Sequence, residues 1–386
     1  MNVDQQVSNS TLTGVRNRQV ILSVIRDTGP ISRTTLTKQL GLTSAAVTTI
    51  VRELIHDGIV VECGSEESAA IGRKPIQLIV NPAVPLIAGA RVRKGYCQVV
   101  VANLSGDLLA SRTSSFAGKN PEDVYKVIQE QLGELTAGRP QGSIEYLCVA
   151  TPGLCNVSCG VIEYSATMDW RNVPFKSDLS ARLGIPVNIE HYTNAASYAY
   201  LRAMHEQPNI IFVNWGIGIS IGIVVEGHIY RGSQGFAGEL GHISVDLLTG
   251  AECSCGGSGC LESICGLEAV LERLNQHTQP EYPLVEQIEA LSADDLQKLV
   301  PIVQVMGSTL ANLVNLFNPD QIILGGEGVT LARRLWHPLL TAFDRQVLDN
   351  LRQSTQLRLD ERDMVLQGAV ALAGTAWIDA KMNRKR

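Results

Sequence analysis

One histidine and three cysteines lie close together in the second half of the chain, at His242, Cys253, Cys255 and Cys260. One imidazole and three thiolates supply the ligand types and the ligand number that a closed tetrahedral zinc site needs. Three glycines between the second and third cysteine let a single loop turn around an ion without side-chain clashes. Because protein atoms fill all four positions, the sequence predicts a zinc ion that holds structure and does not activate water.

The same cluster could instead consist of cysteines that act as small apolar residues, or of cysteines paired in a disulfide, with His242 capping a nearby element. Glycine-rich polar loops are poor places to bury thiols. The chain has nine cysteines, and an odd number argues against a disulfide framework. We also expect neither a signal peptide nor an apolar span long enough for a membrane. The cysteine usage and the expected lack of targeting segments predict a cytoplasmic protein without membrane insertion. The ligand set predicts zinc as its cofactor.

The N-terminal part of the chain differs from the rest in charge. The 386 residues carry a net charge of −6, and 45% of them are hydrophobic, which is enough for two or three domains with well-filled cores. Residues 11–56, however, contain six lysines and arginines against two carboxylates, a net charge of about +4. Such an asymmetry predicts a basic domain that binds nucleic acid.

The same segment has the start and stop signals of a helix-turn-helix. An apolar pattern over residues 20–25 predicts a first helix, which must end before Pro30 because proline cannot continue it. Ser32 and Thr43 are good N-caps for a second and a third helix, and a glycine follows the end of each. The alternative is a small dimerisation or regulatory bundle, which would not explain the basic charge.

The third helix and a predicted wing supply the groups for DNA contact. β-rich runs at 59–62 and 76–80 predict a hairpin whose tip presents two cations to phosphate or to the minor groove. Small polar side chains and one arginine on the third helix suit base edges and phosphates in the major groove. The predicted DNA-binding residues are Arg33, Ser44, Ala45, Thr48, Thr49, Arg52, Arg73 and Lys74.

Beyond Asn81 the chain alternates between strand and helix signals, and helices dominate from Leu261 onward. This order predicts an α/β protein with two lobes and a cleft between them. We therefore expect a winged helix-turn-helix domain over residues 1–81 and a second domain over 82–386. The predicted strands of the second domain cover residues 86–92, 96–104, 108–114, 146–150, 210–213, 220–225 and 321–324.

Three segments of the second domain carry a family resemblance: Gly238–His242 (GELGH), Cys253–Glu262 (CSCGGSGCLE) and Leu313–Gly326 (LVNLFNPDQIILGG). Through them the chain from about residue 84 to 373 resembles the ROK family of sugar kinases and sugar-responsive repressors. The resemblance implies an actin-like, ribonuclease-H-like two-lobed domain. With its N-terminal winged helix, the chain is similar to the repressor branch, which includes the glucose-type, N-acetylglucosamine and xylose regulators.

The chain departs from the resemblance at the positions that kinases use for catalysis. Where ROK kinases have an Asp-x-Gly-x-Thr phosphate loop, residues 89–95 read GARVRKG, and the second phosphate loop has become GIGISIG at 216–222. Tyr192 replaces the aspartate that removes the proton from the sugar hydroxyl, and a phenol with a pKa near ~10 is a poor base at neutral pH. His191 is the remaining candidate for a base. We expect no kinase activity, because phosphoryl transfer depends on all of these parts.

The resemblance also implies a sugar site. Glu239 and Glu262 match family positions that hold sugar hydroxyls, and carboxylates are strong hydroxyl acceptors. His242 would coordinate zinc through one ring nitrogen and face the ligand with the other. The alternative makes the two glutamates solvated charges near a structural metal. The predicted sugar-binding residues are His191, Glu239, His242 and Glu262.

The altered segment at His191 and Tyr192 leaves the effector open between a different sugar and a phosphate ester. A position of His191 beside Arg171 or Lys176 would favour an anionic ligand such as a sugar phosphate. The sequence as a whole predicts a DNA-binding regulator, and a repressor above all, that binds a double-stranded operator as a homodimer or tetramer and responds to a sugar or sugar phosphate. Release by a protein partner and ATP-dependent sugar kinase activity are the alternatives.

Overall fold

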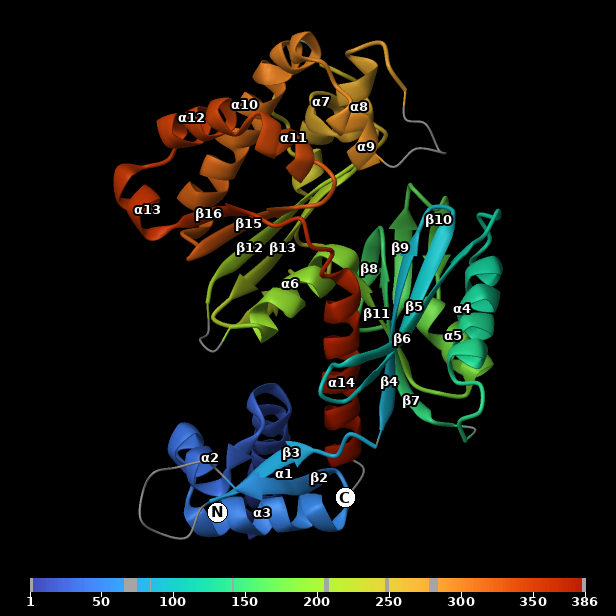
Figure 1. Cartoon of the computed structure of the whole chain (residues 1–386), viewed down its shortest axis with the longest axis vertical. Coiled ribbons are helices and arrows are strands. Elements are labelled where there is room, and N and C mark those ends of the chain that lie inside the picture. The colour runs from blue at the N-terminus through green and yellow to red at the C-terminus, as the bar shows by residue number, and fades with distance from the viewer. Residues whose placement is uncertain are drawn as a thin grey trace. The chain divides into compact units, whose positions relative to one another are not determined.

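The structure, a computed structural model, describes residues 3–65, 75–83, 85–140, 142–204, 208–246, 250–277 and 284–383, with the side chains described from residue 14 onward. The chain divides into two compact units (Figure 1). Unit 1 comprises Met1–Val149, Lys176–Asn188 and Ala369–Arg386, and unit 2 comprises Ala150–Phe175 and Ile189–Gly368. The predicted wing tip with Arg73 and Lys74 lies outside the described residues.

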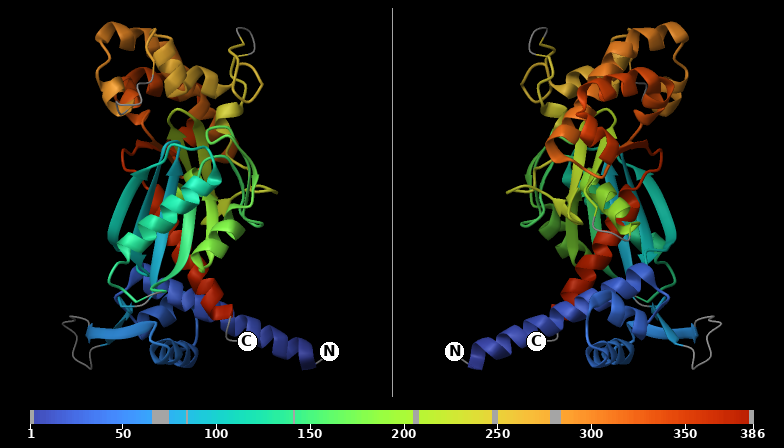
Figure 2. Two further views of the ribbon diagram at one scale, coloured as in Figure 1. Left: turned by 90° about the vertical axis from the view of Figure 1, so that its right-hand side faces the viewer. Right: turned by 90° about the vertical axis from the view of Figure 1, so that its left-hand side faces the viewer.

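Unit 1 begins with three helices and a small sheet, as the sequence predicts. The N-terminal turns of the first helix project beyond the other elements of this part (Figure 2). The sheet has the order β1-β3-β2, and β3 is antiparallel to both neighbours. The elements are α1 (Val3–Thr28), β1 (Ile31–Ser32), α2 (Arg33–Leu40), α3 (Ser44–His56), β2 (Val60–Ser65) and β3 (Ile76–Val80).

Local capping fixes where the short helices begin. The Ser32 side chain accepts a hydrogen bond from the backbone N–H of Thr35, and Thr43 accepts one from Ala46, which confirms both predicted N-caps. Gly41 follows α2 with a φ of 63°, a left-handed conformation that glycine adopts without strain. The three helices meet on a core of Ile21, Leu22, Ile25, Leu36, Val47, Val51 and Leu54, all buried.

The rest of unit 1 is a sheet with helices on both faces. Strands β4, β5 and β6 form an antiparallel meander within the order β11-β7-β4-β5-β6. Helix α4 packs on β5 and β6, and α14 packs on the opposite face (Figures 1 and 2). A Cβ at Gly89 would lie 2.9 Å from Cγ2 of Val370, so glycine lets α14 approach β4 closely. The elements are β4 (Leu86–Arg93), β5 (Tyr96–Asn103), β6 (Leu108–Ser115), α4 (Pro121–Leu135), β7 (Ile144–Thr151), α5 (Phe175–Leu183), β11 (Val187–His191) and α14 (Val365–Asn383).

Unit 2 is built on a second sheet of order β14-β13-β12-β15-β16, in which β15 is parallel to both β12 and β16. Every second residue of β12 and β13 points to one face of this sheet and packs against α7, α8, α10, α11 and α12. Helix α6 lies on the other face (Figure 1). The elements are β8 (Leu154–Asn156), β9 (Val161–Ser165), β10 (Trp170–Val173), α6 (Tyr192–Arg202), β12 (Ile210–Trp215), β13 (Ile219–Val225), β14 (His228–Tyr230), η1 (Leu240–His242), α7 (Leu261–Cys265), α8 (Leu267–Glu272), α9 (Leu284–Glu289), α10 (Ala293–Phe317), β15 (Gln321–Gly325), α11 (Val329–Arg334), α12 (Trp336–Gln346), α13 (Asp349–Ser354) and β16 (Gln356–Leu359).

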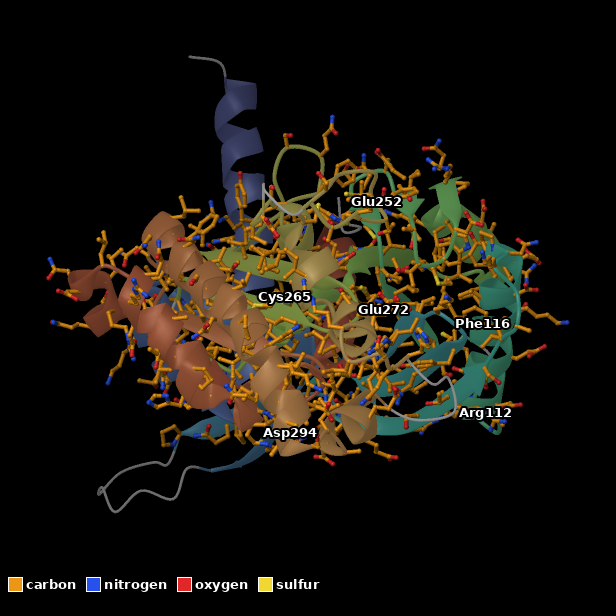
Figure 3. All side chains as sticks on the ribbon, turned by 90° about the horizontal axis from the view of Figure 1, so that it is seen from above. Arg112, Phe116, Glu252, Cys265, Glu272 and Asp294 are labelled. Atoms are coloured by element: carbon orange, nitrogen blue, oxygen red, sulfur yellow. The ribbon has the colours of Figure 1, made fainter. Side chains whose placement is uncertain are left out.

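Helix α10 is the central helix of unit 2. It starts in a capping box in which Ser292 and Asp295 exchange hydrogen bonds, and Asp294 in its first turn is labelled in Figure 3. The expectation of no apolar span long enough for a membrane is wrong by length and composition, because α10 meets both criteria, alone among the described residues. Within the fold, 56% of its apolar stretch is buried, and the helix packs along α12. Its apolar residues therefore serve the core of unit 2.

Candidate functional site

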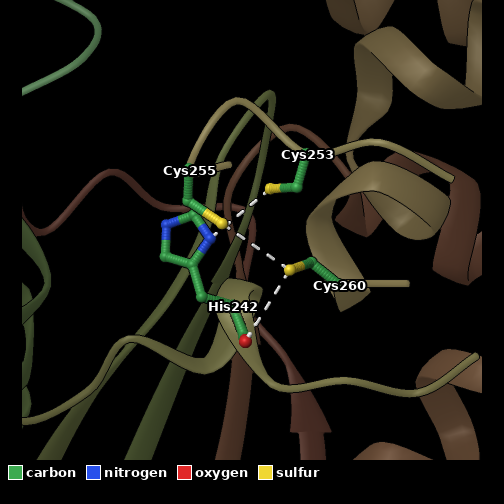
Figure 4. A group of neighbouring side chains, drawn as sticks. All are labelled: His242, Cys253, Cys255 and Cys260. Atoms are coloured by element: carbon green, nitrogen blue, oxygen red, sulfur yellow. Dashed lines mark hydrogen bonds between the residues drawn. The ribbon is translucent and has the colours of Figure 1, made fainter. Parts of the chain in front are cut away.

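The predicted metal ligands come together in unit 2 (Figure 4). His242 ends η1, Cys253 and Cys255 lie in the following loop, and Cys260 immediately precedes α7. The four ligand atoms lie within 4.8 Å of one another. The Sγ atoms of Cys255 and Cys260 are 3.8 Å apart, and Cys253 Sγ is 3.6 Å from His242 Nδ1. The side chains thus form a group that can hold a metal ion.

The loop shifts the pKa values of Cys255 and Cys260 in opposite directions. The backbone N–H of Gly257 lies 3.4 Å from Cys255 Sγ and donates to it, and this lowers the pKa of Cys255. Burial instead raises the pKa of Cys260 to about 12. A bound cation deprotonates a coordinating thiol outright, so the buried thiol needs the metal in order to act as a thiolate.

His242 faces two groups at once. Its Nδ1 points to the thiols, whereas its Nε2 lies 3.9 Å from Oε2 of Glu239. Burial raises the pKa of Glu239 above its ordinary value. The nearby His242 opposes this shift, whereas the Glu262 carboxylate adds to it. Oε2 of Glu262 accepts the backbone N–H of Ile219 at 2.9 Å. The structure therefore brings Glu239, His242 and Glu262 of the predicted sugar site together beside the metal cluster.

The fourth predicted sugar residue, His191, lies at the N-terminal end of α6 and is buried. Its Nδ1 is 2.6 Å from Oγ1 of Thr193, and burial lowers its pKa to about 4, so the ring is neutral at physiological pH. The guanidinium of Arg171, one of the two cations that would favour an anionic ligand if they lay beside His191, stacks over the Tyr164 ring at 4.7 Å.

A buried ion pair supports the start of α6. The Glu190 side chain is only 2% exposed, and it accepts hydrogen bonds from Arg231 at 2.6 and 3.0 Å. Its other oxygen accepts Asn194 Nδ2 at 2.9 Å and the His191 backbone N–H at 3.1 Å. Sequence reasoning missed Arg231, because nothing local to it indicates a partner 41 residues away.

Most of the predicted groove-facing residues of α3 are accessible. Ser44, Ala45, Thr49 and Arg52 are exposed and Thr48 is half-buried, whereas the core residues of α3 lie on its other face. This arrangement leaves one polar face of α3 free for a ligand.

Ion pairs within the winged helix engage three of the six cations in residues 11–56. Arg18 bridges Glu53 and Asp57, and Arg33 pairs with Glu62 at 2.7 Å. Arg26 is only 7% exposed and pairs with Asp27. Arg18, Arg26 and Arg33 are therefore less available to an external anion, although the net charge of residues 11–56 stays at about +4. Among the residues that the structure describes there, those that enter no ion pair are Arg16, Lys38 and Arg52.

The winged helix is also tied to the C-terminal helix within unit 1. Arg26 Nη1 donates to Thr375 Oγ1 at 3.0 Å, and Gln19 Nε2 donates to Asp379 Oδ1 at 3.1 Å. The same helix, α14, begins in unit 2, where a Cβ at Gly368 would lie 1.7 Å from the backbone oxygen of Ala195. Helix α14 is therefore packed on α6 at its start and on α1 further along.

Comparison with known proteins agrees with both parts of this architecture. The model of the ROK family matches residues 91–376, and that of a winged helix-turn-helix DNA-binding domain matches residues 16–61. The chain belongs to the ROK family. The crystal structure of a ROK family transcriptional regulator, a homologue of the E. coli MLC protein, covers 97% of this ROK chain and 99% of its own, with a TM-score of 0.78 and 24% identity. This likeness shows the fold, a winged helix followed by a two-lobed, actin-like domain.

Relatives of this ROK chain include regulators. The xylose repressor of Bacillus subtilis (strain 168) is 28% identical over 325 residues, which cover 82% of this chain and 84% of that protein. The DNA-binding transcriptional dual regulator NagC of Escherichia coli (strain K12) is 27% identical over 394 residues, covering 97% and 96%. A ROK family glucokinase from Streptomyces griseus, solved with glucose and AMPPNP, has a TM-score of 0.63 at 22% identity and covers 75% of this chain and 99% of its own.

Proposed function

We propose that this ROK protein is a transcriptional repressor that binds an operator in the cytoplasm and controls genes of sugar uptake or catabolism. The observation that carries the proposal is the presence of a winged helix-turn-helix and a ROK domain on one chain, an architecture along which the chain aligns with NagC over 97% of its length. The names of the relatives, xylose repressor and NagC among them, support a role in sugar metabolism. We place the boundary between the winged helix and the ROK domain at residues 81 and 82, in the segment between β3 and β4.

The metal is zinc. In tetrahedral zinc sites the zinc–sulfur bond is about 2.3 Å and the zinc–nitrogen bond is about 2.0 Å. These bond lengths place two sulfur ligands about 3.8 Å apart, and a sulfur and a nitrogen ligand about 3.5 Å apart. The observed 3.8 Å between two thiol sulfurs and 3.6 Å between Cys253 Sγ and His242 Nδ1 fit these edges. His242, Cys253, Cys255 and Cys260 would hold the ion, and it would fix the loop beside Glu239 and Glu262.

The effector is a sugar or a sugar phosphate held by Glu239, His242, Glu262 and His191. Carboxylates with open oxygens accept sugar hydroxyls, and the zinc ligand His242 would place its second nitrogen on the same side as Glu239. The proximity of three of these residues supports one site.

Operator binding would use the exposed face of α3 and the wing. The residues are Arg33, Ser44, Ala45, Thr48, Thr49 and Arg52, with Arg73 and Lys74 at the tip. A homodimer, or a tetramer of two dimers, would place two copies of α3 in major grooves about 10 bp apart or a multiple of that spacing. Arg33 would have to exchange Glu62 for a phosphate.

The protein is not a kinase. Tyr192 is a poor proton acceptor, and its hydroxyl already lies 2.9 Å from Ser220 Oγ. Ile217 and Ile219 lie in the segment that resembles the second phosphate loop of ROK kinases, where bulky side chains would crowd the phosphates. The sugar would act instead as a signal, with α14 linking α6 to the winged helix. A coupling free energy of about 1–3 kcal/mol would suffice for a measurable loss of operator affinity.

The test is operator binding by the purified protein on DNA from its own upstream region, titrated with sugars. Release by one sugar or sugar phosphate is the expected result. Specific binding that no compound disturbs would contradict effector control and indicate release by a protein partner. ATP turnover with a hexose would contradict the assignment as a repressor without kinase activity.

A further inference from the structure

Helix α1 contacts α14 through a buried arginine in its last turn. The Arg26 side chain is 3% exposed, and its Nη1 donates to Oγ1 of Thr375, in the middle of α14, at 3.0 Å. Its Nε donates to Oδ1 of Asp27 at 2.7 Å. Gly374 leaves room for the guanidinium, since a Cβ there would lie 3.3 Å from Arg26 Nη1. The end of α1 is therefore joined to α14 by a desolvated charged group.

A second contact joins the same two helices at another point. Gln19 Nε2 donates to Oδ1 of Asp379 at 3.1 Å. Gln19 lies about 10 Å from Arg26 along the axis of α1, and Asp379 lies about 6 Å from Thr375 along the axis of α14. One contact would leave α1 free to turn about it. Two separated contacts fix the direction of α1 on α14.

The polar character of these contacts makes the direction specific. Apolar surfaces can slide past each other at small cost, whereas a buried guanidinium loses its hydrogen bonds when its acceptors move out of line. Burial raises the pKa of Asp27, and Arg26 opposes that shift, so the carboxylate and the guanidinium stabilise each other's charge. Buried polar groups of this kind fix register in helical assemblies.

The direction of α1 also determines that of α3. Arg18 of α1 donates to Glu53 of α3 and, at 2.6 Å, to Asp57 at the C-terminal end of α3. Apolar residues of α1, α2 and α3 share one buried core. The exposed polar face of α3 is therefore held relative to α14 by way of α1.

We propose that Arg26 and Gln19 are positioning residues that hold the winged helix in one direction on α14, and that this direction sets the spacing of the two operator half-sites. The inference rests on the proposed function, in which a homodimer places one α3 in each of two major grooves. Neither residue lies on α3 or on the wing. In the dimer, a turn of each winged helix on α14 would change the distance between the two copies of α3, and a single base pair corresponds to about 3.4 Å of that distance.

Binding to operators of altered spacing tests the inference. Hydroxyl-radical footprinting locates the centre of the fragment that the full-length protein binds in its own upstream region, and a duplex is made with a single base pair inserted there. We expect this insertion to weaken binding by the wild-type protein at least about tenfold. For Arg26→Met and for Gln19→Leu the same insertion should weaken binding by about threefold or less. Gln19→Leu alters a contact at the surface, so it tests the inference even if Arg26→Met fails to fold.

Two further variants separate positioning from stability. Thr375→Val removes the acceptor of Arg26 and should relax the spacing preference, whereas Thr375→Ser keeps a hydroxyl and should retain it. The matched control is Leu36→Ala, which removes a fully buried side chain from α2 and leaves both contacts with α14 in place. This control should lower the melting temperature of the winged helix and keep the wild-type spacing preference.

The outcomes distinguish this inference from the repressor assignment. A wild-type spacing preference in folded Arg26→Met and Gln19→Leu would overturn the inference and leave operator binding intact. It would also be overturned if Leu36→Ala relaxed the preference as much as Arg26→Met, or if the wild-type protein bound both spacings equally. Absence of operator binding by the wild-type protein would contradict the proposed function, and this inference with it.

Discussion

Arg52 is the arginine of α3 whose replacement should affect DNA binding alone. It is exposed, and it enters none of the ion pairs that the structure describes in the winged helix. Each phosphate contact contributes about 0.9 to the slope of log K against log salt on B-DNA. In the proposed homodimer, which carries two copies of Arg52, Arg52→Ala should reduce this slope by about 1.8. A fourfold rise in salt would then cost the variant about twelvefold less affinity than the wild type.

The matched control is Arg18→Met, which removes a charge from the same domain at an internal position. The Arg18 side chain is 14% exposed and bridges Glu53 and Asp57, the latter 18% exposed. Loss of this charged hydrogen bond to Asp57 should lower the free energy of unfolding by about 1.5–3 kcal/mol and leave the salt slope unchanged. Fluorescence anisotropy of labelled operator at several salt concentrations, with urea unfolding of each variant, measures both quantities.

An unchanged slope in Arg52→Ala would refute the assignment of the α3 face to DNA. The same conclusion would follow if Arg18→Met reduced the slope as much as Arg52→Ala did while remaining folded. A uniform loss of stability in both variants would contradict the distinction between a free and an internally paired arginine.

The remaining predictions concern the metal and the core. Elemental analysis should find about one zinc per chain, and Cys255→Ser should lose the metal and lower the melting temperature; a metal-free protein with unchanged melting would contradict the zinc site. Arg231→Met should cost about 3–5 kcal/mol in urea unfolding, because it leaves the Glu190 carboxylate buried without its cation, and a cost below ~1 kcal/mol would speak against this. Leu54→Ala should cost about 2–5 kcal/mol, seen as earlier unfolding of the winged helix, since Leu54 is fully buried, and wild-type stability would be inconsistent with that packing.

The winged helix could be predicted from the sequence because its signals are local. A capping side chain and the N–H group that donates to it are three residues apart, as at Ser32 and Thr43. Pro30 likewise prevents α1 from continuing, whatever the tertiary contacts of the chain. The metal ligands could also be predicted, because few residue types bind zinc, and His242 and the three cysteines lie within 19 residues of one another.

The electrostatics of the winged helix could not be predicted in this way. The partners of Arg18 lie 35 and 39 residues away and that of Arg33 lies 29 residues away, so a count of charges along the segment does not tell which cations are paired. Arg26 contributes to the net charge of the segment, but it is buried and donates a hydrogen bond to Thr375, which lies 349 residues away. Only packing decides which of these cations remains available to phosphates.

Short strands were also missed. β16 (Gln356–Leu359) has four residues and pairs in parallel with β15 at the edge of its sheet, and a four-residue polar and apolar alternation is a weak signal. The three strands β8, β9 and β10 are short and form a separate small sheet.

The measurement that tests the account most directly is operator release by a sugar. The purified protein is bound to a labelled DNA fragment from its own upstream region, and anisotropy is followed while D-xylose, the hexoses and their 6-phosphates are added. We expect tight, salt-dependent binding that one sugar or sugar phosphate reverses. Failure to bind any fragment of that region at low salt would contradict the assignment as a DNA-binding regulator.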